Sequence, residues 1–192
     1  MTKHSLSWYK PGKTVEVQDT MQRSSYLLTE LPGDNFDPLF KPELSPEEML
    51  KLGIFEGKYL CDCQEEFPKE WYTLAKLSPQ KADPTINFFK IKSRLSLQEW
   101  QKRGWIPAGP GDTDIRGWFQ WYCRYWLGRR MPTIDIIQIK RWRAFVRHKA
   151  QIIHSLARLP EEKKPKTKAD TLFHRPRQRQ ALLQWAYNPC IL

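Results

Sequence analysis

Three aspartates are the candidate catalytic residues of this chain. Asp112 and Asp114 lie in a loop rich in glycine and proline, and Asp135 follows at the start of a basic helical pattern. Carboxylates gathered in this way could hold magnesium in a nuclease, or one could act as general base in an enzyme that excises bases. Asp114 and Asp135 also fit a simpler role, because acidic residues at helix N-termini interact favourably with the helix dipole. Catalysis therefore stays an open alternative.

Positive charge is concentrated in the second half of the chain. The 192 residues have a formal net charge of +11. Residues 1–100 contain 13 Lys and Arg against 15 Asp and Glu, whereas residues 101–192 contain 19 against 6. Such an asymmetry points to a polyanionic partner that is bound mainly by the second half. Nucleic acid is the first candidate, and an acidic protein is the second.

A regular row of basic and polar residues predicts the surface that would meet this partner. Residues 134–158 carry two stripes at helical spacing: an apolar one of Ile139, Trp142, Val146, Ala150, Ile153 and Ala157, and a polar one of Lys140, Arg143, Arg147, Gln151, His154 and Arg158. No carboxylate occurs between Asp135 and Glu161, so Lys140, Arg143 and Arg147 of this row have no acidic neighbour at i±4. We therefore expect the apolar face to pack and the adjacent face to bind an anion.

Arginine suits phosphate because its planar guanidinium can donate two parallel hydrogen bonds. The side chains expected to contact phosphates are Arg129, Arg130, Lys140, Arg143, Arg147, Arg175, Arg177 and Arg179. Tryptophan can stack on a base, and the two candidates for this role are Trp105 and Trp121. The expected ligand is DNA rather than RNA.

The stretch GWFQWYCRYWLGRR, residues 117–130, combines six aromatic residues with three arginines. On a helical wheel over residues 114–127 the aromatic side chains fall within an arc of about 160°. Arg116, Gln120 and Arg124 lie on the opposite side of that wheel. An aromatic stripe at helical spacing is typical of burial, so we expect this helix to pack its aromatic face into the core.

The remaining patterns predict a mainly α (α+β) fold, as one compact domain over residues 1–192 with an aromatic core and a small β element. Residues 1–44 are expected to form an irregular wrapping segment. The predicted helices are 45–53, 95–104, 114–127 and 134–158, with a further helix entry at 67–78. The predicted strands are 57–63 and 85–93. Residues 159–170 read as a charged linker or loop, and residues 171–192 as a basic segment with a short helix that docks on the body.

Other signals argue against several classes of protein. The cysteines are four and irregularly spaced, and the CDC at 61–63 is too close for a usual zinc half-site. The chain contains no GxxxxGK[ST], HExxH or GxGxxG motif. We therefore expect no metal and no cofactor. With no secretory signal and no long apolar run, the sequence is typical of a soluble intracellular protein without a membrane partner.

Several blocks resemble a family of uncharacterised proteins from microbes, algae, fungi and large DNA viruses. These blocks are GWFQWYCRYWLGRR, IKRWRAFVRH and RPRQRQALLQWAY in the second half, with LSPEEMLKLGIFEGKY in the first. No activity is known for that family. The resemblance implies a single compact module and assigns it no chemistry.

The sequence leads to one functional hypothesis and two alternatives. The hypothesis is a nucleic-acid-binding protein that contacts phosphates through an arginine-rich helical face. The first alternative is a nucleic-acid-processing enzyme of the glycosylase or nuclease type, in which Asp112→Ala or Asp114→Ala would abolish activity and retain binding. The second is a structural subunit that docks its basic face on an acidic protein, in which case binding to DNA or RNA would be weak.

Overall fold

A helical scaffold and one small sheet make up the computed structural model, which describes residues 3–92, 95, 97–105 and 113–191. The α-helices are α1 (Pro46–Leu52), α2 (Leu97–Lys102), α3 (Trp118–Trp126), α4 (Pro132–Ala144), α5 (Arg147–Ala157), α6 (Lys168–Phe173) and α7 (Pro176–Leu183). The strands are β1 (Thr14–Gln18) and β2 (Arg23–Leu27), which pair antiparallel. The mainly α (α+β) class with a small β element is thereby confirmed.

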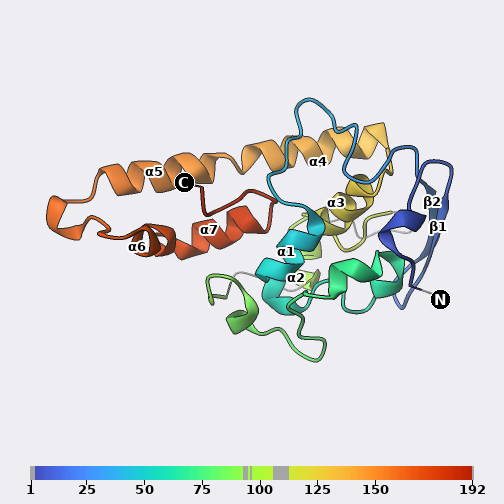
Figure 1. Ribbon diagram of the computed structural model, residues 1–192, viewed down its shortest axis with the longest axis horizontal. Helices are drawn as coiled ribbons and strands as arrows, with labels where there is room; N and C mark the ends of the chain where they lie inside the picture. Colours follow the sequence, from blue (N-terminus) through green and yellow to red (C-terminus); the bar gives the residue numbers. More distant parts are fainter. Residues whose placement is uncertain (1–2, 93–94, 96, 106–112, 192) are drawn as a thin grey trace.

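The elements divide into a body and an arm (Figure 1). The sheet, α1, α2 and α3 belong to the body. Helices α4 and α5 follow one another almost in line along one edge, and α5 continues outward beyond the body. The chain then turns back through α6 and α7, and we call α5, α6 and α7 together the arm. The projecting part therefore belongs to the second half of the sequence, which holds most of the positive charge and also supplies α3 to the body.

Helix α3 lies at the centre of the core. Phe119, Trp121, Tyr122 and Cys123 are buried, and Phe40 packs edge-on against the rings of Trp121 and Tyr122. The helix begins only at Trp118, later than predicted, since Gly117 before it has a φ of 83° that an α-helix does not adopt. The aromatic stripe packs as the sequence indicates.

The polar side of α3 is buried as well, which the helical wheel did not predict. Arg116, just before the helix, and Gln120 and Arg124 within it are all inaccessible to solvent. Arg116 pairs with Asp19 and Asp62, while the guanidinium of Arg124 is held by carboxylates from elsewhere in the chain. Residues distant in sequence cover this face, and their positions cannot be deduced from the period of one helix.

The sheet lies in the segment that we expected to be irregular. Along β1, Val15 and Val17 point inward and their neighbours outward, the alternation that a half-exposed strand requires. The predicted strands 57–63 and 85–93 are wrong over their described residues, which form turns and 3-10 segments. Leu60 and Lys90 have φ values of 59° and 53°, and a left-handed residue interrupts a strand.

The junction between β2 and α3 requires a glycine. Gly128 ends α3 with a φ of 106°, and a Cβ atom there would lie 2.1 Å from the carbonyl oxygen of Glu30. The Gly128 carbonyl accepts hydrogen bonds from the backbone N–H groups of Thr29 and Glu30. This close backbone contact fixes the exit of the sheet against the end of the central helix.

The long helix predicted over 134–158 is two helices. Between Phe145 and Lys149 the backbone makes i→i−3 hydrogen bonds, which tighten the turn and shift the buried stripe. Consequently four of the six residues of the predicted apolar stripe are exposed, namely Val146, Ala150, Ile153 and Ala157, and Ile152 is buried in their place.

Local capping signals locate the shorter helices. Ser45 and Glu48 form the predicted capping box of α1, and an equivalent box between Thr167 and Asp170 starts α6. That box lies in the segment 159–170, so part of the predicted linker is helical. At the end of the chain, Leu182 and Leu183 of α7 are buried against the body, as predicted.

Candidate functional site

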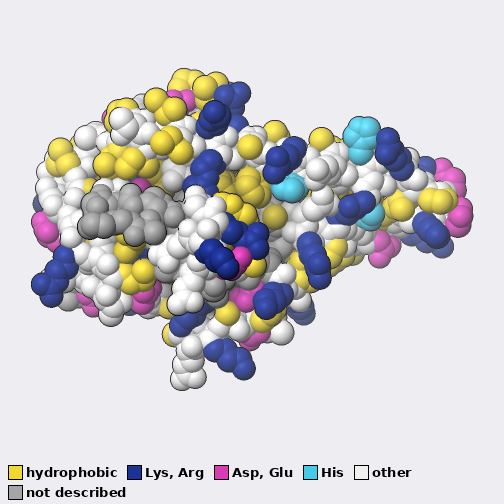
Figure 2. All heavy atoms as spheres, turned by 180° about the vertical axis from the view of Figure 1, so that it is seen from behind, with side chains coloured by type: hydrophobic (Ala, Val, Ile, Leu, Met, Phe, Trp, Pro, Cys, Tyr) yellow, Lys and Arg dark blue, Asp and Glu magenta, His cyan; other side chains and the backbone are white. Residues whose placement is uncertain are grey.

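The exposed cations on α4, α5 and α7 form the candidate site. Each of these side chains is exposed, and Figure 2 shows Lys and Arg side chains distributed along the arm. We call this set the basic face, and its members are Lys140, Arg143, Arg147, Arg158, Arg175 and Arg177. Within the described part of the chain, none of the six takes part in an ion pair. The row that the sequence predicts as uncompensated is therefore exposed and without carboxylate partners there.

Aromatic stacking joins the basic face to the core. Trp142 of α4 stacks on Tyr187 with ring centroids 4.8 Å apart, and the Tyr187 hydroxyl donates to the Trp142 carbonyl. Phe145, at the junction of α4 and α5, stacks on Trp185 at 4.1 Å. Burial raises the pKa of Tyr187 beyond the usual range of a phenol, so this hydroxyl stays a donor at neutral pH. These contacts give the arm a rigid base.

Hydrogen bonds to neutral acceptors hold α7 beside α5. Gln178 donates through Nε2 to Gln151 Oε1 at 2.7 Å, and the Arg175 Nε donates to Ser155 Oγ at 2.9 Å. His174 Nε2 also lies 2.9 Å from Ser155 Oγ. The acceptors in the seam between the helices are thus neutral, and the positive charge of Arg175 has no carboxylate partner among the described residues.

Arg175 has an unusual backbone conformation. It precedes Pro176, yet its φ and ψ are 57° and 52°, whereas a residue before proline favours an extended conformation. Left-handed conformations of residues other than glycine cost free energy and occur often at functional sites. This strain places the Arg175 side chain at the start of α7, against α5.

Three of the predicted phosphate contacts are structural instead. Arg129 is buried and donates through Nη2 to Asp114 at 2.7 Å. Arg179 is also buried, and it donates to the carbonyl oxygens of His174, Thr171 and Pro189. Arg130 is half-buried, lies 3.9 Å over the Tyr125 ring and donates to four backbone carbonyls. All three therefore leave the set of candidate phosphate ligands.

The predicted stacking residues have different environments. Trp121 has no exposed surface, and its indole Nε1 donates to Asp135 at 2.8 Å, so it is unable to stack on a base. Trp105 is 46 % exposed. The guanidinium of Arg103 lies 5.1 Å over its ring, and Arg141 donates to its backbone carbonyl. Stacking by Trp105 stays a prediction.

The two candidate catalytic aspartates that the structure describes, Asp114 and Asp135, are buried. Asp114 is buried between Arg124 and Arg129. Asp135 accepts from the Trp121 indole and from the Met131 backbone N–H, and its burial raises the pKa of its carboxyl group. Asp112 lies outside the described residues. Two of the three carboxylates thus have structural roles that account for their positions.

A buried ion-pair cluster surrounds Arg124, and sequence analysis missed its central acidic member. Glu66 holds Arg124 through two hydrogen bonds, of 2.5 and 3.0 Å. Burial alone would lower the pKa of Arg124, but Glu66 and Asp114 raise it above its ordinary value. Glu66 is separated from Arg124 by 58 residues, and no local pattern connects the two.

A cleft of about 580 Å³ lies next to this cluster, beside β1 and residues 61–66. The side chains of Asp19, Cys63 and Glu66 on its wall have ligand atoms within 4.8 Å of one another, a spacing that a metal ion could bridge. Asp19 already binds Arg116, and Glu66 already binds Arg124. Because guanidinium groups occupy both carboxylates, we interpret the group as part of the structural cluster.

Comparisons of the chain with other proteins do not extend this assignment. Among the described residues, no helix combines the length and the apolar character needed to cross a membrane. Comparison with protein-family models, with curated proteins and with solved structures finds no match for this chain.

Proposed function

We propose that this protein binds nucleic acid, and DNA rather than RNA, through the phosphate contacts of its basic face. The observation that carries the proposal is the exposed, uncompensated row of cations on α4 and α5, with Arg175 and Arg177 on α7 beside it. Like charges held together repel one another, so the arrangement costs free energy until an anion binds. A polyanion with regularly spaced phosphates matches a row in which one cation follows another along a helix.

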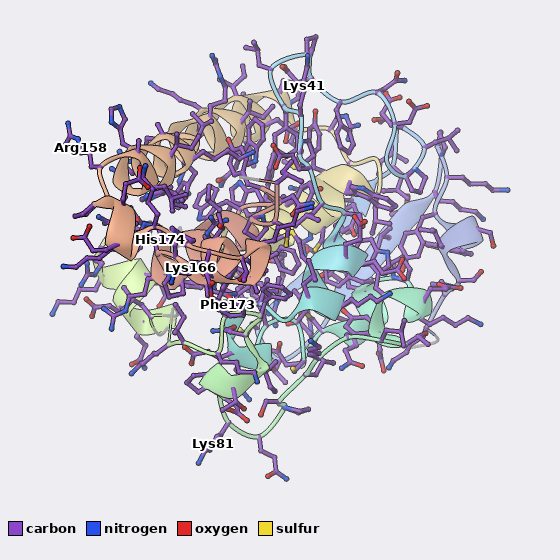
Figure 3. The ribbon with its side chains drawn as sticks, turned by 60° about the vertical axis from the view of Figure 1, so that its left-hand side comes forward. Lys41, Lys81, Arg158, Lys166, Phe173 and His174 are labelled. Atoms are coloured by element: carbon purple, nitrogen blue, oxygen red, sulfur yellow. The ribbon has the colours of Figure 1, made fainter. Side chains whose placement is uncertain are left out.

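Fluorescence anisotropy of labelled DNA and RNA over a salt series tests the proposal. The variant Arg143→Glu/Arg147→Glu reverses two charges on the basic face. Its matched control, Lys10→Glu/Lys81→Glu, makes the same change of net charge at two exposed lysines of the body, and Lys81 lies far from α5 (Figure 3). Each phosphate contact contributes about 0.9 to the slope of log K against log salt.

The wild type is expected to bind with an affinity that falls steeply as salt increases. The basic-face variant should bind at least about tenfold more weakly at low salt, with a slope reduced by about two. The control should retain most of the affinity and nearly the whole slope. Absence of binding at about 50 mM salt, where phosphate contacts are strong, would reject the proposal and leave the basic face as a docking surface for an acidic protein.

A further inference from the structure

Building on the proposed function, we infer that α5 enters the major groove of duplex DNA and that Gln151 and His154 contact the edges of the bases. The cations around them contact the flanking phosphates. The inference concerns the form of nucleic acid and the residues that read it, so it can fail while phosphate binding itself holds.

The first support is the exposure of α5. Of its eleven residues, Ile152 is buried, and the others are exposed or partly exposed. The helix runs outward from the body, with α6 and α7 alongside it (Figure 1). An α-helix is about 10–12 Å across with its side chains, and the major groove of B-form DNA, about 12 Å wide, admits one. A helix that served only to pack would bury a wider stripe.

The second support is the order of side chains along the exposed face. Arg147, Gln151, His154 and Arg158 are separated by four, three and four residues, so they lie on one line of α5. Neutral side chains with donors and acceptors occupy the middle of this line, and cations occupy its ends. Neutral donors and acceptors suit contacts to base edges, and cations suit contacts to phosphates. This order matches a helix whose centre lies deepest in the groove.

The third support is the way in which Gln151 is held. Its Oε1 accepts from Gln178 Nε2 at 2.7 Å and lies 3.0 Å from His148 Nδ1. The amide is therefore oriented by its neighbours through the oxygen, and its Nε2 donor has no hydrogen-bond partner among the described residues. A glutamine amide can donate to N7 of adenine in the major groove. His154 is exposed beside it.

The fourth support is the second row of cations on α7. The hydrogen bonds from α7 to Gln151 and Ser155 hold Arg175 next to α5, and packed helices lie about 8–10 Å apart. Beyond Arg158 the tip of the arm is of mixed charge, because Glu161 pairs with Lys164 and Glu162 follows. Figure 2 shows blue and cyan side chains along the arm and magenta at its tip. Cations therefore flank α5, whereas lysines and acidic side chains are mixed at the tip.

Duplex DNA fits this surface better than duplex RNA does. The major groove of A-form RNA is deep and narrow, and side chains cannot read it. Arg158, at the outer end of α5, and His174, before α7, lie on the two halves of the arm (Figure 3). An arm that projects in this way can enter the wide major groove of B-form DNA more readily than the narrow major groove of A-form RNA.

The test uses a duplex DNA selected from a random pool by the full-length protein, measured by anisotropy. The competing probes are one strand of that duplex, the same sequence as duplex RNA, and the same DNA duplex with 7-deazapurines, which lack the N7 acceptor of the major groove. The variant Gln151→Ala/His154→Ala removes the proposed base contacts without a change of formal charge. Its matched control is Gln18→Ala/Gln80→Ala at exposed positions of the body, and circular dichroism verifies that both variants are folded.

The selected duplex should bind at least about tenfold more tightly than the single strand or the RNA, and 7-deaza substitution should weaken it several-fold. Gln151→Ala/His154→Ala should lower the preference for the selected duplex over a random one by at least about tenfold, with an unchanged salt slope, and the control should alter neither. Three results would each overturn the inference: equal or tighter binding of the single strand or the RNA, binding that 7-deaza substitution does not change, or an unchanged preference in the variant. Salt-dependent binding would still support the proposed function in all three cases. If no nucleic acid binds, both fail.

Discussion

The arginines around α3 and those of the basic face have the same chemistry and opposite environments. Arg116, Arg124 and Arg129 are at most 4 % exposed, and each is held by at least one carboxylate. Arg143 and Arg147 are exposed and have no carboxylate partner in the described part of the chain. A buried guanidinium must be paired because its desolvation is costly, whereas an exposed one can stay unpaired in water. The difference separates arginines that hold the fold from arginines that can bind a ligand.

The largest expected effect comes from removing the shared carboxylate of the buried cluster. Asp114→Asn leaves both Arg124 and Arg129 without a negative partner at this position, so we expect the free energy of unfolding to fall by about 3–5 kcal/mol. Urea denaturation measures the loss, and Glu47→Gln on the exposed face of α1 is the control, expected within about 0.5 kcal/mol of wild type. If the two variants lose equal stability, the buried arginines do not depend on Asp114.

A smaller, pH-dependent effect is expected at Asp135, where burial raises the pKa of the carboxyl group. Such a group stabilises the fold below its unfolded pKa of about 3.9, and this contribution is lost as pH rises through the folded pKa. Asp135→Asn cannot ionise, but it loses the acceptor for the Met131 N–H, at a cost of about 1 kcal/mol. The variant should therefore be less stable near pH 4 and approach wild type at neutral pH.

Urea titrations of wild type and Asp135→Asn at both pH values check this expectation. A constant stability difference would show that folding leaves the pKa of Asp135 unshifted, whereas a difference that widens as pH rises would show that the charged carboxylate is favoured in the fold. That result would place Asp135 with the paired acids of the cluster instead of apart from them.

Arg175 combines strain with exposure, and its replacement should separate stability from binding. Arg175→Gly relieves the left-handed backbone, which glycine adopts readily, and should raise the free energy of unfolding by up to about 1 kcal/mol. The same variant removes a cation of the basic face and should bind nucleic acid several-fold more weakly. Arg175→Lys, which keeps both the charge and the strain, serves as comparison. Weaker binding in the glycine variant without any gain in stability would argue that the Ser155 hydrogen bond offsets the strain.

The smallest effect concerns the repulsion within the basic face. Salt screens exposed charges, so the free energy of unfolding of wild type should rise by a few tenths of a kcal/mol between low and moderate salt. In Arg143→Glu/Arg147→Glu the rise should be smaller, and stability at low salt should be within about 0.5 kcal/mol of wild type. Thermal and urea unfolding at two salt concentrations measure both quantities. A loss of several kcal/mol would mean that these arginines, like those of α3, hold the fold.

Sequence periodicity predicted some elements of this fold and misplaced others for identifiable reasons. The capping box of α1 is confirmed because its hydrogen bonds lie within four residues. The sheet was misplaced because residues 85–93 have the composition of a strand but a left-handed residue at Lys90. The break at Phe145 escaped prediction because the stacking of Phe145 on Trp185 involves a residue forty positions away.

The candidate site was predicted in part, and the errors have one cause. Lys140, Arg143, Arg147, Arg175 and Arg177 are exposed as expected. Arg129 and Arg179 look alike in sequence, yet one binds Asp114 and the other three backbone carbonyls. Spacing along a helix indicates which residues share a face, but it does not show whether water or another segment covers that face.

By itself the sequence determined the helical class, the aromatic core, the capped ends of short helices and the absence of carboxylates along residues 136–160. These properties depend on residue type and on neighbours within one or two helical turns. Only the tertiary structure decided that Glu66 and Asp114 neutralise Arg124, that α5 projects beyond the body, and that Arg147, Gln151 and His154 are exposed on it. Pairing and burial depend on distances between segments far apart in the chain, and those distances are set by the packing of the whole molecule.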